Sequence, residues 1–369
     1  MMPLGPQLER LWDITPQEFG LLVAAYTFSA GAIGLLGSFF MDRFDRKHAL
    51  IFLYVGFLIG TFACAASDSF EMLLIARCAT GAFGGLLGAT VLSIVGDLTT
   101  LKNRSETMGV IMAAFSAASV FGVPFGLFLA DQFGWQSPFL FLGLIGIPVL
   151  VLNVTMLPNV KEHLSRTPPK PLALLQEMLA KKNALTAHVF IVLLMLGQFS
   201  VITFIAPYMV SNVGFTEGEL AYIYLAGGFV TFFSAPWFGK LADKYGQYQF
   251  FAVVTGLSLI PLWAITNLPQ MNLYAVIVIT SVMFVLISGR IIPAMTMITS
   301  SVRQERRGGF MSINSAIQQL GAGVASYVAG LIMVKTSTGE YQDYDMVGYL
   351  AITASIMAIL VARRMKAVS

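Results

Sequence analysis

The residues best suited to chemistry in this chain lie in two similar charged segments. Residues 37–50 read GSFFMDRFDRKHAL, and residues 239–247 read GKLADKYGQ. An apolar run ends in Asp42 in the first segment and in Asp243 in the second, and a base follows at once. A carboxylate at a helix end can pair with bases or with the N-terminus of another helix. We interpret the segments as latches that break and re-form during a conformational change, with a solvated polar hairpin as the alternative.

The elements that must position these segments are membrane helices. Hydrophobic residues make up 57% of the 369 positions, charged residues make up 11%, and the mean hydropathy is +0.77. A soluble domain averages about 25% charged residues, so the composition predicts an integral membrane protein in contact with the lipid bilayer. The net charge of +3 suggests no nucleic-acid partner. Cys64 and Cys78 lie within apolar runs, where we read them as packing residues rather than metal ligands.

Apolar runs of about 20 residues, the length that crosses a bilayer, occur eleven times. The predicted spans are residues 17–41, 49–66, 70–95, 108–130, 138–157, 187–210, 220–238, 250–266, 273–298, 310–334 and 346–362. A polar linker follows the fifth span, which divides the chain into an N-terminal bundle over 1–157, the linker over 158–185 and a C-terminal bundle over 186–369. The two aspartate segments indicate that the bundles are duplicated, as is typical of secondary transporters.

A duplicated chain should contain six spans in each half, but the first half has only five. The chain opens MMPLGPQL, which resembles the end of a membrane helix. We predict that residues 1–8 are the remnant of a first span whose larger part is missing.

The distribution of basic residues predicts the orientation in the membrane. If the linker is cytoplasmic, all but four of the 22 Lys and Arg lie on its side of the bilayer. Arg10 and Lys335 lie on the opposite side, and Arg77 and Arg290 lie within spans. The sequence therefore predicts a plasma (inner) membrane protein with a cytoplasmic C-terminus.

The charged segments also resemble the signature loop of the major facilitator superfamily, G-x-x-x-D-[RK]-x-G-[RK]-[RK]. The positions that match are Gly239, Asp243, Lys244 and Gly246 in the second copy and Asp42, Arg43, Arg46 and Lys47 in the first, where Ser38 and Asp45 replace glycines. The resemblance covers the whole chain and implies an all-α fold of two six-helix bundles with inverted repeats. It also implies a charge relay in which Asp97, at the end of the fourth span, pairs with Arg46; a solvated helix end is the alternative for Asp97.

Arg77 lies within a span, where an ionisable side chain is a functional-site hypothesis by default. Its surroundings, RCATG, resemble the R-x-x-x-G motif of the family, in which the arginine is linked to proton coupling or substrate binding, and Thr80 replaces a common glutamine. We predict that Tyr26 belongs to the same substrate-binding or coupling site as Arg77 and Thr80. Arg77 could instead reach the outer surface, because Glu71 lies only six residues earlier.

A second intramembrane arginine, Arg290, has polar companions in neighbouring spans, namely Gln198, Asn314 and Gln318. One interpretation is a cavity in which Arg290 binds a polar or anionic group. The other is a set of hydrogen bonds between helices, each contributing about 0.6 kcal/mol.

Glycine and proline interrupt the span that contains SVFGVPFG. Gly122, Pro124 and Gly126 resemble the antiporter motif of the family, although Val123 intervenes, and they predict a conformational hinge.

The sequence has no nucleotide-binding loop, catalytic triad or metal cluster, so we predict neither an enzyme nor a cofactor. The best interpretation is a monomeric secondary carrier that resembles the drug and sugar efflux branch, including its drug:proton antiporters. Its partners would be a small-molecule substrate and protons, although no Asp or Glu lies deep in a complete span. The alternatives are a metabolite importer and a transport-incompetent sensor or scaffold.

Overall fold

The structure, a computed structural model, describes residues 1–37, 43–98, 107, 111, 114, 118–160, 181–303 and 307–368. Asp42 lies outside the described residues. Almost every described element is a helix, because a chain in a bilayer satisfies its backbone polar groups internally. The elements are η1 (Met2–Leu4), α1 (Gly5–Trp12), α2 (Pro16–Gly37), α3 (Arg46–Ala65), α4 (Phe70–Leu98), η3 (Ala118–Gly122), α6 (Val123–Phe133), α7 (Ser137–Met156), α9 (Lys182–Tyr208), η5 (Met209–Val213), α10 (Glu217–Tyr245), α11 (Gln247–Thr266), α12 (Leu273–Ser300), α13 (Arg307–Ile332), β1 (Val334–Lys335), β2 (Tyr341–Gln342) and α14 (Tyr344–Ala362).

Within the described residues, nine helices are long and apolar enough to cross a membrane. Helix α13 is as long as these nine but carries Asn314, Gln318 and Gln319. The all-helical, polytopic membrane fold that the sequence predicts is therefore confirmed.

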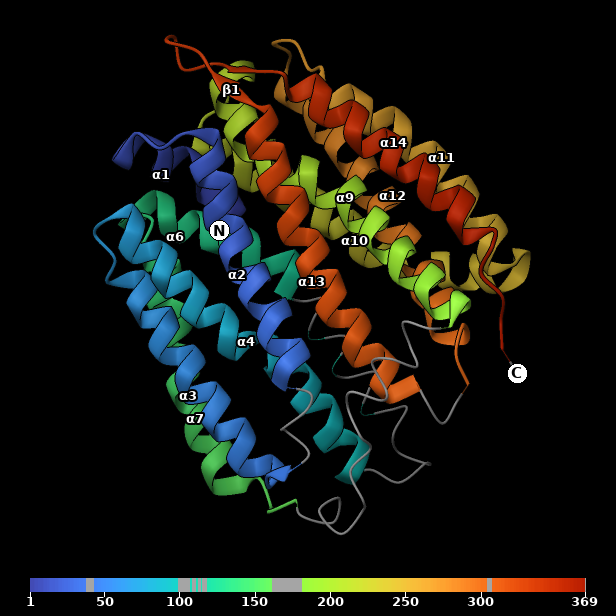
Figure 1. Ribbon diagram of the computed structural model, residues 1–369. Helices are drawn as coiled ribbons and strands as arrows, with labels where there is room; N and C mark the ends of the chain where they lie inside the picture. Colours follow the sequence, from blue (N-terminus) through green and yellow to red (C-terminus); the bar gives the residue numbers. More distant parts are fainter. Residues whose placement is uncertain are drawn as a thin grey trace.

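The helix pairings of the first half recur in the second half six spans later. In the first half α2 packs on α4, α4 on α3 and α3 on α7. In the second half α10 packs on α12, α12 on α11 and α11 on α14. Figure 1 shows the first set and the second set as two neighbouring groups of helices. This recurrence is the arrangement that a duplicated sequence would give.

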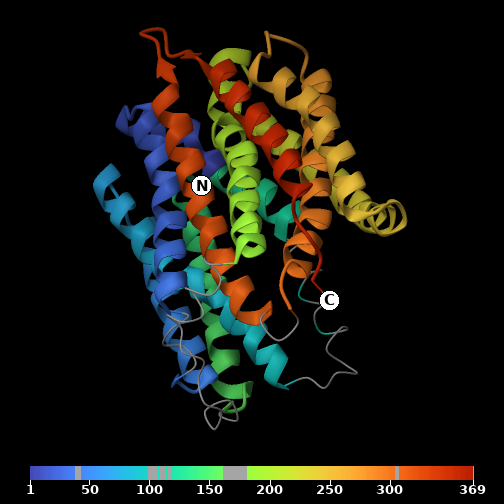
Figure 2. The same ribbon diagram turned by 45° about the vertical axis from the view of Figure 1, so that its right-hand side comes forward.

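Two helix pairs, α2 with α13 and α6 with α10, make most of the contact between the N-terminal and C-terminal helices, and η1 and α1 also pack on α9. Figures 1 and 2 both show α2 and α13 side by side, where the two groups meet. Glycines bring these two backbones close together: a Cβ on Gly20 would come within 2.7 Å of the Ser326 carbonyl oxygen, and one on Gly330 within 2.6 Å of the Pro16 carbonyl oxygen. Small residues of this kind allow membrane helices to approach closely.

The two ends of the helix groups carry different structures. The hairpin end carries α1 and the short β1–β2 hairpin, in which Val334 pairs with Gln342 and Lys335 with Tyr341. The linker end is where α7 ends and α9 begins, and it lies at the bottom of Figure 1.

Several predicted span boundaries differ from the structure by a few residues. Helix α9 begins at Lys182, inside the predicted linker, because the Asn183 side chain donates to the carbonyls of Ser301 and Lys366, at 2.7 and 2.8 Å. The predicted span 310–334 ends early, because Val334 pairs in the hairpin. Residues 1–8 form η1 and part of α1, in which Leu4 and Leu8 are buried.

Candidate functional site

Polar contacts across the hairpin end tie α1 to the second helix group. Arg10 forms an ion pair with Glu217 at the start of α10, and the Gln7 amide donates to the same carboxylate. Lys335 Nζ in β1 donates to Glu9 Oε2 at 3.1 Å. We call this set the hairpin-end clasp: Gln7, Glu9, Arg10, Asn212, Glu217, Lys335 and Tyr341.

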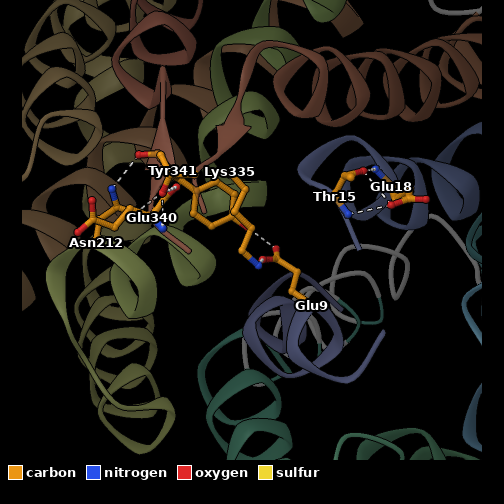
Figure 3. A network of polar contacts seen from close by, with 8 residues as sticks. Glu9, Thr15, Glu18, Asn212, Lys335, Glu340 and Tyr341 are labelled. Carbon is orange, nitrogen blue, oxygen red and sulfur yellow. Dashed lines mark hydrogen bonds and ion pairs between the residues drawn. The ribbon is translucent and has the colours of Figure 1, made fainter. Parts of the chain in front are cut away.

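Glu9 is the buried centre of the clasp, with only 2% of its surface exposed. The Tyr341 hydroxyl donates to Glu9, and the Asn212 side chain fixes Tyr341 through both of its backbone groups, at 2.8 and 2.9 Å. Figure 3 shows Tyr341 and Lys335 converging on Glu9. Burial raises the pKa of Glu9, while the hydrogen bond from Tyr341 and the charge of Lys335 oppose this rise. The carboxylate is thus held by partners from the other half of the chain.

The sequence did not predict the clasp, although one signal pointed to it. Arg10 and Lys335 are the two bases that break the predicted charge asymmetry. The structure explains both exceptions, because each base pairs with a carboxylate of the opposite helix group.

A second charged cluster lies at the linker end, in the first copy of the predicted latch. Arg46, in the first turn of α3, forms an ion pair with Asp97 near the end of α4. Asp45 caps α3: its Oδ1 accepts from the backbone N–H of Lys47 at 2.9 Å and of Val160 at 3.2 Å. Burial would raise the pKa of Asp45, but these hydrogen bonds and His48 outweigh it and lower the pKa. Arg43 is exposed just before this cluster.

The second copy of the latch makes local contacts. Asp243 Oδ1 accepts from Gln247 Nε2 at 2.8 Å, and Lys244 Nζ lies 5.1 Å from the centre of the Tyr245 ring. Among the described residues, neither charge forms an ion pair with the first helix group. The two copies therefore differ in what they contact in this conformation.

A cavity of about 680 Å³ lies between the two helix groups toward the linker end. It is lined by α2 and α4 on one side and by α13 on the other, and Arg46 and Gln318 lie in its wall. Gly84, Gly85 and Gly88 of α4 leave its surface without bulky side chains. A volume of several hundred Å³ fits a small molecule.

Arg77 and Tyr26 lie against each other, as their grouping in the sequence suggested. The Arg77 guanidinium carbon is 4.6 Å from the centre of the Tyr26 ring, a cation–π distance. Arg77 Nε is buried and has no hydrogen-bond partner within the described part of the chain. Thr80 instead donates to the Ala76 carbonyl at 2.7 Å, and a Cβ on Gly60 would come within 2.6 Å of its hydroxyl. Thr80 therefore packs α4 against α3.

Arg290 lies inside the second helix group, fully buried. Its guanidinium donates to the Ser355 hydroxyl at 3.0 Å and to the Gly197 carbonyl at 3.1 Å, joining α12 to α14 and α9. Gln198 and Asn314 have buried side-chain atoms with no partner among the described residues. The structure thus places Gln318, but not Arg290, among the residues that line the 680 Å³ cavity.

The predicted hinge coincides with a change of helix type. Gly122 ends the π-helix η3, and Pro124 and Gly126 lie in the first turn of α6. A π-turn before a proline is a common way to accommodate its missing N–H within a long helix.

Comparisons with known proteins identify the class to which this helical membrane protein belongs. The family model described as Major Facilitator Superfamily matches residues 1–325 and, in a second match, residues 189–367. The chain therefore belongs to the major facilitator superfamily, a family of transporters. The resemblance drawn from the two charged segments is confirmed.

Curated relatives match most of the chain at low identity. An uncharacterized MFS-type transporter, YceJ of Bacillus subtilis (strain 168), is 21% identical over 338 residues, which are 91% of this chain and 85% of the relative. The quinolone resistance protein NorA of Staphylococcus aureus (strain MSSA476) is 22% identical over 335 residues, 90% of this chain and 85% of the relative.

Solved structures share the fold. A bacterial homolog to the human lysosomal transporter Spinster, in an inward-facing and unoccupied conformation, has a TM-score of 0.73 and 16% identity, covering 99% of this chain and 93% of that one. A D-xylose-proton symporter has a TM-score of 0.77 and 14% identity, covering 98% and 92%.

Proposed function

We propose that the protein is a proton-coupled secondary carrier that exports a small molecule from the cell by alternating access. In this proposal the chain is a monomer of the plasma (inner) membrane, and the linker end and the C-terminus face the cytoplasm. The basic residues at the linker end support this orientation under the positive-inside rule.

The observation that carries the proposal is the difference between the two ends. At the hairpin end two ion pairs, from Arg10 and from Lys335, join the helix groups. Toward the linker end a 680 Å³ cavity lies between them. Such an asymmetry is what a carrier with one side closed and the other open would have. In this proposal export requires the hairpin-end clasp to open and the linker end to close.

When the linker end is closed, the charged residues at that end would form new contacts. Among the described residues, Asp243 and Lys244 contact local partners, whereas Arg46 and Asp97 already pair. We propose that this closure is governed by a charge relay of six residues: Asp42, Arg43, Arg46, Asp97, Asp243 and Lys244. We also propose that the substrate or the coupled proton binds at Arg77, Tyr26 and Gln318.

A reversible cross-link tests whether the hairpin end must open. In a Cys78→Ser background, Gln7→Cys and Glu217→Cys replace two side chains that contact each other across the helix groups. Oxidation should abolish transport in proteoliposomes, and a reductant should restore it. The control pair Thr15→Cys and Glu18→Cys joins residues of one helix turn, and its oxidation should leave the rate unchanged. Undiminished transport through the oxidised Gln7–Glu217 pair would contradict alternating access.

Two probes can distinguish drug transport from sugar transport, and each is a compound for which a similar protein is named. A fluorescent fluoroquinolone tests drug export, and D-xylose tests sugar transport. Export of the fluoroquinolone that stops when the proton gradient collapses would support the antiporter, whereas proton-driven accumulation of D-xylose would favour an importer. Binding of either probe without movement would favour a sensor or scaffold.

A further inference from the structure

A smaller cavity lies between η3, α6, α10 and α12. Its volume is about 320 Å³, and its wall includes Val120, Tyr224, Thr231, Phe284 and Ser288. This volume is at the lower end of the range of small-molecule sites. We call it the α10 cavity.

Two hydroxyls in the wall of this cavity are buried without a partner. Tyr224 Oη and Thr231 Oγ1 each have no hydrogen bond to any residue that the structure describes. Buried hydroxyls normally find a partner, so each unpaired group in a native structure calls for an explanation. A bound molecule that offers hydrogen-bonding atoms would provide one.

Comparable hydroxyls in α9, α12 and α14 are paired. The hydroxyls of Tyr208 and Tyr344 donate to backbone carbonyls at 3.0 and 2.8 Å. The hydroxyl of Thr280 donates to the carbonyl one helical turn earlier, at 2.8 Å, as threonine in a membrane helix usually does. Thr231 and Tyr224 depart from this pattern, and both border the same cavity.

Aromatic rings in the wall of the α10 cavity favour an aromatic ligand. The rings of Tyr224 and Phe284 stack, with centroids 5.7 Å apart and an interplanar angle of 30°. Gly227 makes this possible, because a Cβ there would come within 2.2 Å of the Phe284 ring. Tyr224 and Thr231 are seven residues apart on α10, about 10 Å along the helix axis. The two hydroxyls therefore belong to residues two helical turns apart in the wall of one cavity, so a ligand that bonds both must carry a hydrogen-bonding group at each end.

The lining also indicates the charge of the ligand. Every described residue in the wall of the α10 cavity is uncharged. An unpaired charge is costly to bury, whereas a neutral polar group loses little if it is hydrogen-bonded. We infer that the α10 cavity binds a neutral, planar aromatic molecule that exchanges hydrogen bonds with Tyr224 and Thr231. The inference that this cavity holds a transported molecule rests on the proposed function. Its test measures binding alone and does not require transport.

The test uses naphthalene-2,6-diol, which is planar, carries one hydroxyl at each end and is neutral at pH 7. Equilibrium dialysis against the purified full chain should show saturable binding. Tyr224→Phe and Thr231→Val remove one hydroxyl each at nearly constant shape, and each should weaken the affinity about fivefold to tenfold, the range expected for a lost hydrogen bond. Tyr222→Phe, on the same helix but 61% exposed, is the matched control and should bind like the wild type.

Two further probes test the chemistry of the ligand. Naphthalene lacks both hydroxyls and should bind more weakly than the diol, and the two substitutions should not weaken its binding further. N-methylquinolinium carries a positive charge and should bind more weakly still. Tighter binding of the cation, wild-type affinity for the diol in both Tyr224→Phe and Thr231→Val, or no saturable binding of the diol would each overturn the inference. Fluoroquinolone export with no binding of the diol would contradict the α10 site alone, whereas binding of the diol without any transport would contradict only the proposed function.

Discussion

At the scale of single residues, the contribution of a charged side chain to stability depends on its partners and its burial. Removing one member of a buried ion pair leaves the other uncompensated, whereas an exposed pair contributes little to stability. Glu9, with 2% of its surface exposed, is of the first kind. Arg46 and Asp97 have side chains that are 13% and 25% exposed and lie between the two extremes. The two pairs therefore give different predictions.

Replacing Glu9 with Gln should change how stability depends on pH. The pKa of Glu9 is raised above its usual 4.5, mainly by burial, so the folded protein holds this proton to a higher pH than the unfolded chain does. The free energy of unfolding should therefore fall as pH rises from about 4.5 through the raised pKa. Glu9→Gln should lack this fall.

Thermal unfolding in detergent at a series of pH values measures the effect. The control is Glu340→Gln, because Glu340 belongs to the same hairpin but is exposed. Curves for wild type and Glu9→Gln that stay parallel across this range would show that Glu9 titrates normally.

Breaking the Arg46–Asp97 pair should affect transport more than stability. Arg46→Ala should lower the free energy of unfolding by no more than about 1 kcal/mol, because the pair is partly exposed, yet transport should fall at least tenfold. Exchanging the charges, with Arg46→Asp and Asp97→Arg together, should restore part of the rate. Arg303→Ala, at an exposed arginine of the same end, is the control. A rate that survives Arg46→Ala would remove this pair from the gate.

At the scale of elements, the contact between the helix groups depends on close backbone approach. The α2–α13 pair is built on glycines that face backbone carbonyls, where no side chain can move aside. The α6–α10 pair instead begins with a π-turn and Pro124, which soften the helix. One interface is therefore a rigid contact, and the other is a candidate for bending.

Alanine at two glycines should have opposite effects on stability. Gly330→Ala would place a Cβ within 2.6 Å of the Pro16 carbonyl oxygen and should destabilise the protein by about 1–3 kcal/mol. Gly256→Ala in α11 meets no atom within 4 Å and should stabilise it slightly, since alanine suits a helix better. Midpoints of thermal unfolding measure both. Equal shifts would mean that the α2–α13 contact yields to a methyl group.

At the scale of the whole molecule, the cavity and the clasp predict which face is open. Ser315 is exposed in the wall of the 680 Å³ cavity, and Thr338 lies in the hairpin. In a Cys78→Ser background, Ser315→Cys should react with a membrane-impermeant maleimide from the cytoplasmic side. Thr338→Cys should react from the opposite side. Labelling of Ser315→Cys only from the hairpin side would invert the proposed orientation or the open face.

Much of the architecture was predictable because its signals are local. Runs of apolar residues gave the membrane helices, and the charged segments gave the family, since both patterns can be read without knowing any contact. The pairing of Arg46 with Asp97 followed from the family resemblance. The role of Arg290 could not be predicted from the sequence, because its two interpretations differ only in which neighbours its side chain contacts.

The sequence alone determined that the chain is a helical membrane protein of the major facilitator superfamily, because composition and short motifs survive without any tertiary information. The tertiary structure alone decided that Glu9 meets Lys335 and Tyr341, more than three hundred positions away. It also placed Arg290 within a helix bundle and left two hydroxyls unpaired beside a small cavity. The physical reason is that a side chain's chemistry is set by its burial and partners, which depend on how distant helices pack.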